Sequence, residues 1–357
     1  MIVGQAKQTL RTWVQVGLDD YPGLCGAHLV GGITGFPDTA FFPEYKDVDL
    51  HLILEEGSPA LQSTNPFENN LEISYDGLMI EGGLKPRTDY ASAEAVLANP
   101  EIAYHLTRDS ILYDPQGFLH NMQARVKEEY PRRQWVKARC EYERHGLDGV
   151  MALLPMARQM DASGAADFGL LGYSTTFLIA LMCVATLQAP TTGSTARLKL
   201  RAILTEYNQL ELYEAFTSLL GVESITPAQA SQLIQEAEAL FDTAVLFKRT
   251  PIPFGHKLRA HLRPYFVDSC RTMLNDGHFG EAATWSIPFY MASCNTMLVD
   301  GPDDQRPYYA QKLLDLLSLL GLDSVDWNQR WAQARQLYDA FFALAAEVVE
   351  RNPDVVG

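Results

Sequence analysis

The sequence lacks the motifs of several common classes of protein. Its five cysteines are scattered and form no CxxC pair, which argues against a disulfide framework and against a cysteine zinc site. The phosphate-binding pattern GxxxxGK[ST] is absent, so the chain is not a P-loop enzyme. Positive charge is also scarce, because 28 lysines and arginines stand against 44 acidic residues. The resulting net charge of −16 argues against duplex DNA or RNA as a partner.

Signals for export or for a membrane are weak. Residues 1–16 lack the unbroken apolar core and the small-residue cleavage site of a signal peptide. Residues 168–187 contain no charge and approach membrane-spanning length, but they include the hydroxyl-rich run YSTT, and no second such segment accompanies them. We therefore expect a buried helix there, no membrane partner and a cytoplasmic location.

The first third of the chain has strand signals. Residues 5–20 are predicted to form an amphipathic helix, because their apolar side chains recur at helical spacing. Short apolar runs broken by glycine, proline, asparagine and aspartate follow. The segment LEISY-DG-LMIEG predicts a hairpin, because Asp76-Gly77 suits a two-residue type I′ turn. We expect a short helix at residues 91–98 and a last edge strand from Ser110 to Tyr113.

After about residue 120 only helical patterns follow, and no repeat of fixed period is visible. We expect loops at Gly146 and at residues 189–195, 221–226, 249–254 and 300–306. The fold class predicted is α+β. A domain with a small mixed β-sheet, residues 1–125, precedes an all-α helical bundle domain, residues 126–357, and the boundary lies between residues 120 and 147.

Two acids on one predicted strand are the strongest functional signal. A strand runs into Gly31-Gly32, a loop follows, and the next strand carries Asp47-Val48-Asp49. Residues i and i+2 of a strand point to the same face, so the two aspartates share a face and repel each other unless a cation lies between them. Carboxylate oxygens favour Mg²⁺, and glycine lets backbone N–H groups approach phosphates closely.

A third acid, Glu81, lies on the second arm of the predicted hairpin, between apolar residues and two glycines. Its alternative role is that of an edge-strand charge that discourages aggregation. His51 follows Asp49 on the same strand face and is expected near the metal site. The other histidines form no convincing set of ligands.

The order Gly-Gly, Asp-x-Asp on the next strand, then a lone acid on a later strand resembles the DNA polymerase β-type nucleotidyltransferase superfamily. Within it, the chain is most similar to the aminoglycoside nucleotidyltransferase-like enzymes, which join such a catalytic domain to a helical C-terminal domain. The resemblance implies that Asp47 and Asp49 hold two magnesium ions. It implies that Glu81 is a metal ligand, the base for the acceptor, or both.

The chain departs from that family at two points. The family usually has Gly-Ser where this sequence has Gly31-Gly32, so a hydroxyl expected at the phosphates is missing, and Thr34 is the candidate to supply it. The loop from Gly32 to Asp47 is long and rich in aromatic residues and proline. In the helical domain, PTTGSTARLKLR includes Lys199, which we expect to bind the β- and γ-phosphates, as a lysine does in related enzymes. The alternative is a solvated helix face.

These features predict Mg²⁺-dependent transfer of a nucleoside monophosphate, with ATP as the expected co-substrate, to a hydroxyl of a small acceptor. An acidic surface suits a cationic acceptor such as an aminoglycoside-like compound. A toxin-type enzyme that modifies a protein or tRNA is one alternative. A nucleotide-binding regulatory protein without turnover is the other.

Overall fold

The computed structural model describes residues 1–62, 70–160, 163–191 and 193–357. Its internal contacts divide the chain into two compact units. Unit 1 comprises Met1–Tyr142, Cys183–Thr191 and Ala345–Gly357, and unit 2 comprises Glu143–Met182 and Thr192–Leu344. Three long helices have residues in both units, namely α5 (Arg133–Met160), α6 (Ala165–Ala185) and α13 (Trp327–Arg351).

Unit 1 contains a five-stranded sheet in the order β3-β4-β2-β1-β5. The strands are β1 (Leu24–Leu29), β2 (Asp47–Leu54), β3 (Asn70–Tyr75), β4 (Leu78–Pro86) and β5 (Ile111–Tyr113). β2 and β4 are parallel, and the other neighbours are antiparallel. The small mixed sheet predicted from the sequence is therefore confirmed, and β5 forms its edge as expected.

The hairpin between β3 and β4 has the predicted turn. Asp76 has a φ of 46° and Gly77 a φ of 77°. A type I′ turn requires positive φ at both central residues, which aspartate and glycine tolerate best. The turn fixes the register in which Tyr75 pairs with Leu78 and Glu72 pairs with Glu81.

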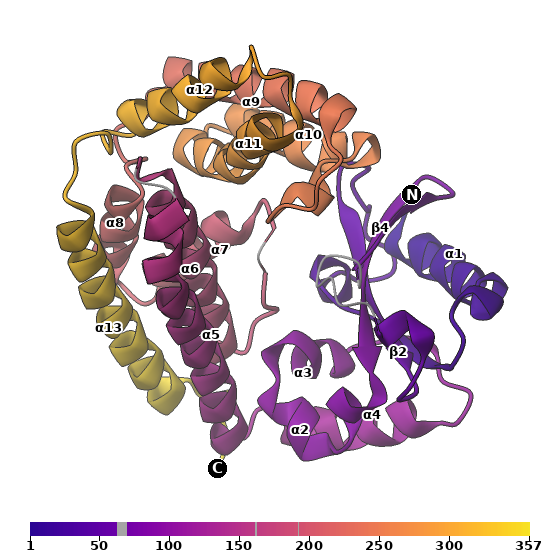
Figure 1. Ribbon diagram of the computed structural model, residues 1–357. Coiled ribbons are helices and arrows are strands. Elements are labelled where there is room, and N and C mark those ends of the chain that lie inside the picture. Colours follow the sequence, from indigo (N-terminus) through magenta and orange to yellow (C-terminus); the bar gives the residue numbers. More distant parts are fainter. Residues whose placement is uncertain (63–69, 161–162, 192) are drawn as a thin grey trace. The chain divides into compact units, whose positions relative to one another are not determined.

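Helices cover both faces of this sheet (Figure 1). One apolar cluster joins α1 (Val3–Val16) to alternate residues of β2, namely Val48, Leu50 and Leu52. The other face packs on α2 (Ala93–Ala98), α3 (Pro100–Leu106) and α4 (Phe118–Glu129). α1 ends at Val16, four residues before the predicted end, because Gly17 forms its C-cap.

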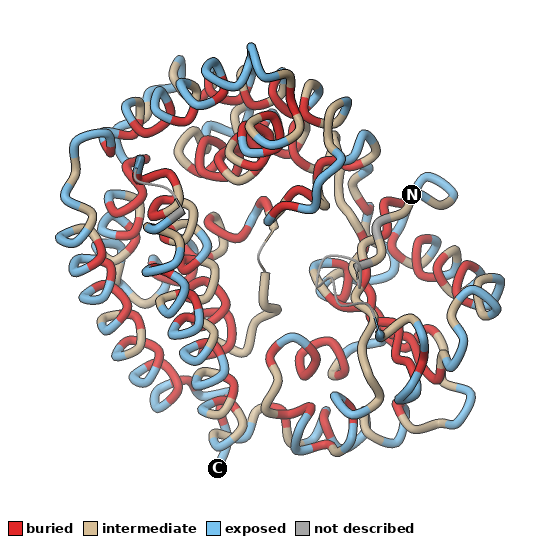
Figure 2. Tube along the Cα trace, in the orientation of Figure 1, coloured by how far each residue is buried: buried red, intermediate tan, exposed pale blue. Residues whose placement is uncertain are grey.

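Unit 2 is helical, as predicted for the C-terminal part. Its further helices are α7 (Ala196–Glu206), α8 (Leu210–Leu219), α9 (Pro227–Phe247), α10 (Arg263–Asn275), α11 (Phe279–Asp300) and α12 (Arg306–Leu319). α11 packs against α9, α10 and α12 and is buried along most of its length (Figure 2). Such a helix is apolar on nearly all sides because it has little contact with water.

Two other helices bear on the sequence predictions. α6 is long and apolar enough to cross a membrane, but 67% of its apolar window is buried inside the protein, as expected of a core helix. α5 continues through Gly146, so the loop predicted there is wrong. A Cβ at Gly146 would lie 2.1 Å from the Phe177 ring of α6, so the glycine allows these two helices to pack closely.

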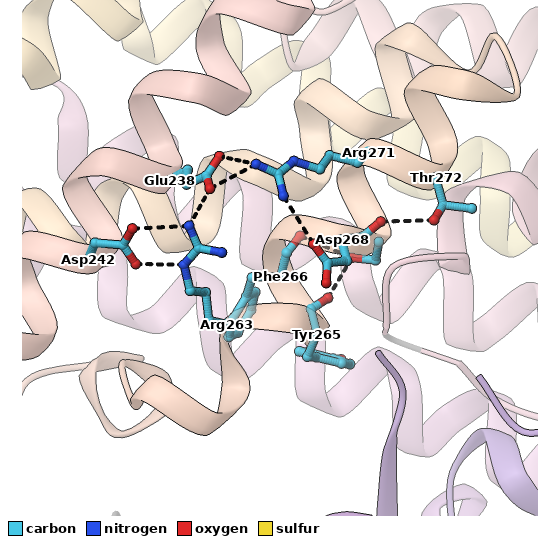
Figure 3. Close-up of polar contacts among 9 residues, drawn as sticks. Glu238, Asp242, Arg263, Tyr265, Phe266, Asp268, Arg271 and Thr272 are labelled. Carbon is cyan, nitrogen blue, oxygen red and sulfur yellow. Dashed lines mark hydrogen bonds and ion pairs between the residues drawn. The ribbon is translucent and has the colours of Figure 1, made fainter. Parts of the chain in front are cut away.

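Some of the acidic residues form ion pairs that join α9 to α10 (Figure 3). Arg263 of α10 bonds to both Glu238 and Asp242 of α9, and Arg271 Nη2 lies 2.7 Å from Glu238 Oε2. These side chains are partly exposed, so each pair stabilises the fold by no more than about 1 kcal/mol. They join α10 to α9 at the surface of unit 2.

Two turns of unit 2 are alike in sequence and structure. Residues 218–224 read SLLGVES at the end of α8, and residues 318–324 read SLLGLDS at the end of α12. In both turns the residue after the glycine donates its N–H to the carbonyl five residues earlier, from Val222 to Thr217 and from Leu322 to Leu317. That hydrogen bond is the Schellman pattern at a helix end. The likeness is a short internal repeat that is not evident from periodicity along the whole chain.

Candidate active site

The three predicted acids come together on the sheet. Asp47 and Asp49 of β2 and Glu81 of β4 each offer a carboxylate oxygen, and these oxygens lie within 4.8 Å of one another. Parallel pairing causes this, because Asp49 is directly opposite Glu81 in the register of β2 and β4. All three residues are partly buried, and each retains a surface accessible to solvent.

Alternation along β2 determines which face carries the acids. Val48, Leu50 and Leu52 point into the apolar cluster under α1. Residues at odd positions therefore face the other way, and they place Asp47, Asp49 and His51 in one row. Shifting this strand by one residue would bury the aspartates and expose the core residues, so the core itself fixes the orientation of the site.

Gly31 makes a close contact with one of the acids. Its φ of 66° and ψ of −160° lie in a region that is essentially restricted to glycine. A Cβ at this position would lie 1.9 Å from Oδ2 of Asp49. The Asp49 carbonyl also accepts a hydrogen bond of 2.9 Å from the Val30 amide, which holds the turn beside β2. Gly31 is thus required both by its conformation and by the space that the carboxylate occupies.

Gly32 differs from Gly31 in its surroundings. It is exposed, its φ is not in the left-handed region, and a Cβ there would meet no atom within 4 Å. A side chain, including the serine that the resembling family usually carries, would fit at this position. This open position begins the 3-10 helix Gly32–Gly35 and directly follows Gly31, which contacts Asp49.

Thr34 and His105 form hydrogen bonds with the glycine turn. Thr34 Oγ1 lies 2.9 Å from the Gly31 carbonyl oxygen and 2.8 Å from Nδ1 of His105. His105 comes from α3, and its Nε2 accepts a hydrogen bond of 3.3 Å from the Gly31 amide. Burial is the main cause that lowers the pKa of His105 to about 3, so the ring is neutral at physiological pH.

A second series of hydrogen bonds links His51, in the row of acids, through Tyr90 to His28. His28 of β1 has Nδ1 3.0 Å from the Leu29 carbonyl and Nε2 2.7 Å from the Tyr90 hydroxyl. A carbonyl only accepts, so His28 donates from Nδ1 and accepts from Tyr90 at Nε2. The Tyr90 oxygen then accepts from Nδ1 of His51, at 2.9 Å. Because Nδ1 of His51 carries the proton in this series of hydrogen bonds, its Nε2 carries a lone pair. That edge of the ring faces Gly83 of β4.

Burial explains the charge states in this series of hydrogen bonds. It lowers the pKa of His28 to about 4 and that of His51 well below its usual range, and it raises the pKa of Tyr90. Both histidines are therefore neutral at physiological pH. His51 lies outside the set of residues whose oxygens lie within 4.8 Å of one another. The hydrogen bond at its Nδ1 is with Tyr90 and not with one of the acids.

The loop between the glycine turn and β2 is anchored to α1. The Val3 amide donates to the Ala40 carbonyl at 3.0 Å, and Lys7 Nζ lies 2.8 Å from Asp38 Oδ1. Lys46 lies with its ammonium 5.2 Å from the centre of the Phe36 ring. Burial lowers the pKa of Lys46, and the neighbouring Asp47 opposes that effect. These contacts hold the long aromatic loop in place up to Lys46, the residue before Asp47.

Lys199 belongs to unit 2, on α7, and is partly exposed. Arg197, Lys199 and Arg201 are close in sequence, but they do not share one face of α7. Arg201 Nη1 lies 3.4 Å from the buried Glu281, and the charge of Glu281 also acts on the buried Arg197. Residues four apart share a helix face, whereas Lys199 lies two residues from each and faces the other side. Its role with phosphates stays a prediction.

Sequence reasoning missed His28, Tyr90 and His105 as parts of the site. They come from a strand, a 3-10 turn and a helix that are far apart along the chain. No local spacing relates them to the acids. The signal that was available is His51, whose place on the acid face pointed to polar neighbours.

The chain matches no protein-family model and no curated protein. Among solved structures, the crystal structure of a nucleotidyltransferase-like protein from Exiguobacterium sibiricum is similar to it at a TM-score of 0.28 and 13% sequence identity. The similarity covers 89% of this chain and 92% of that chain. A TM-score this low supports no conclusion about fold or activity.

Proposed function

We propose that the chain is a Mg²⁺-dependent nucleotidyltransferase. It moves a nucleoside monophosphate, AMP in the first instance, from a nucleoside triphosphate to a hydroxyl of a small acceptor and releases pyrophosphate. The observation that carries the proposal is the convergence of three carboxylates within 4.8 Å beside the Gly31 turn. The order of these residues along the chain, which resembles that of the polymerase β-type superfamily, supports it.

The three acids fit magnesium. The donor set consists of oxygen atoms, and Mg²⁺ prefers one or two carboxylates completed by water and substrate phosphates. Partial burial suits such a site, because the carboxylates are held by the sheet while one side stays accessible to a substrate. When bound, magnesium ions supply positive charge that stabilises the phosphoryl group and the departing pyrophosphate.

Each residue has a defined task under this proposal. Asp47 and Asp49 would hold the metal ions from one strand. The Glu81 carboxylate, from the neighbouring strand, would bind metal, accept the proton of the acceptor hydroxyl, or do both. Gly32 would leave backbone exposed to the phosphates. Lys199 is proposed to bind the β- and γ-phosphates from unit 2.

The acceptor is proposed to be cationic, such as an aminoglycoside-like compound. The support for this class is the net charge of −16, since an acidic surface concentrates cations near it. A modified protein or tRNA and a regulatory protein without turnover are the competing outcomes.

Pyrophosphate release from ATP and Mg²⁺, measured with a panel of small cationic acceptors, tests the proposal. We expect release with the wild-type protein and none with Asp47→Ala. Asp19→Ala removes an exposed acid beyond the end of α1 and serves as the matched control. Release only with a protein or tRNA acceptor would favour the toxin-type activity. ATP binding without release from any acceptor would favour the regulatory protein.

A further inference from the structure

The ring of His105 is held between two groups of the same turn. Its Nε2 accepts from the Gly31 amide at 3.3 Å, and its Nδ1 lies 2.8 Å from the Thr34 hydroxyl. Thr34 Oγ1 in turn lies 2.9 Å from the Gly31 carbonyl. His105 is 3% exposed and Thr34 is 6% exposed, so water does not compete for these bonds.

The positions of the protons in this arrangement follow from the donors and acceptors. A backbone amide only donates, so Nε2 of His105 carries a lone pair, and the neutral ring carries its proton on Nδ1. That proton goes to the Thr34 oxygen. A carbonyl only accepts, so the Thr34 hydroxyl proton goes to Gly31. The three bonds form a closed ring in which every donor has one acceptor.

The closed ring of hydrogen bonds fixes Gly31 at the point where it contacts Asp49. Both the amide and the carbonyl of Gly31 are engaged, and the Gly31 Cα lies against the Asp49 carboxylate. A change in the conformation of the turn would therefore displace the Asp49 carboxylate. The Thr34 proton is used within the ring, whereas the sequence predicts that this hydroxyl contacts a phosphate.

We propose that His105 is a positioning residue of the active site and that Thr34 acts with it. As the neutral Nδ1–H tautomer, His105 holds the glycine turn against Asp49 and so fixes the carboxylate that binds metal. The existence of the hydrogen-bonded ring is independent of the proposed function. Its effect on metal binding rests on that function.

Thr34 offers a matched pair of variants. Thr34→Val keeps the shape but removes the hydroxyl, which breaks two of the three bonds. Thr34→Ser keeps the hydroxyl and loses only a methyl group. We expect the Kd for Mn²⁺ alone, without nucleotide, to rise about 10-fold in Thr34→Val, the scale seen when a supporting hydrogen bond at a metal site is lost. Thr34→Ser should stay close to wild type.

The pair separates positioning from a phosphate contact. A hydroxyl that only contacts phosphate cannot affect Mn²⁺ binding in the absence of nucleotide. Equal Mn²⁺ affinity in Thr34→Val and Thr34→Ser would therefore overturn the inference. A general loss of stability would lower the melting temperature of the variant. The proposed loss of positioning would instead lower the Mn²⁺ affinity of the folded protein.

The tautomer of His105 in the wild-type protein is a second test that needs no variant. Nitrogen-15 NMR at neutral pH should show a protonated Nδ1 and a bare Nε2, and a proton on Nε2 would overturn the ring. Failure of the wild-type protein to bind Mn²⁺ would contradict the proposed function instead. In that case the tautomer still decides whether the ring exists.

Discussion

Substitution of the two adjacent glycines should have opposite consequences. Gly31→Ala introduces a Cβ that would lie 1.9 Å from Asp49 Oδ2, in a backbone conformation that L-residues avoid. The conformation alone costs about 1–3 kcal/mol of folding free energy, and the overlap adds to this unless Asp49 moves. Gly32→Ala meets no atom within 4 Å and should stabilise the protein by about 0.4–1 kcal/mol, since it restricts the unfolded chain.

Urea denaturation of both variants measures these free energies, and Mn²⁺ titration of the folded proteins measures the metal site. We expect Gly31→Ala to lose both stability and metal affinity, because the added methyl group displaces the Asp49 carboxylate. Gly32→Ala should lose neither. If the two variants are alike in stability and in Mn²⁺ affinity, the contact between Gly31 and Asp49 does not organise the site.

Three further predictions follow from single residues. Lys199→Ala should raise the KM for the nucleotide more than that for the acceptor in steady-state assays, and an unchanged nucleotide KM would return Lys199 to a solvated helix face. Glu81→Gln should lower kcat by roughly 10²–10⁴-fold with little change in nucleotide affinity if Glu81 is the base. Recovery of the rate at high Mg²⁺ would show instead that it is mainly a metal ligand. Acid should destabilise the fold through His28 and His105, whose pKa values of about 4 and about 3 lie below the usual 6.5. The unfolded chain then binds protons that the folded chain does not, which costs ~2 kcal/mol for each histidine between pH 6.5 and about pH 5. Urea denaturation across this range should give a shallower loss for His28→Asn than for the wild-type protein, and equal slopes would contradict the assignment.

The sequence predicted the parts of the site that depend on local pattern. Asp47 and Asp49 share a face because strand alternation is strict, and the Asp76-Gly77 turn brings the arm with Glu81 back along the sheet. The parallel pairing of β2 with β4, which places Glu81 opposite Asp49, is not encoded in either strand alone. It results from packing of the whole sheet.

The supporting residues depend on long-range packing and were not predictable. His105 meets the glycine turn only because α3 packs over the sheet, and it lies 71 residues from Thr34. Gly146 failed as a loop signal for the same kind of reason, since its role is contact with Phe177 of another helix. The cluster of Arg197, Lys199 and Arg201 looked continuous in sequence, but the helix turns two of the three towards Glu281.

The most direct test of the central claim is to locate the metal ion and the nucleotide. Crystals grown with Mn²⁺ and a non-hydrolysable ATP analogue would reveal the ion by its anomalous scattering. The proposed function predicts the anomalous peak among the carboxylates of Asp47, Asp49 and Glu81, with the triphosphate of the analogue bound to the same ion. An ion bound elsewhere, or an analogue bound away from these three acids, would contradict it.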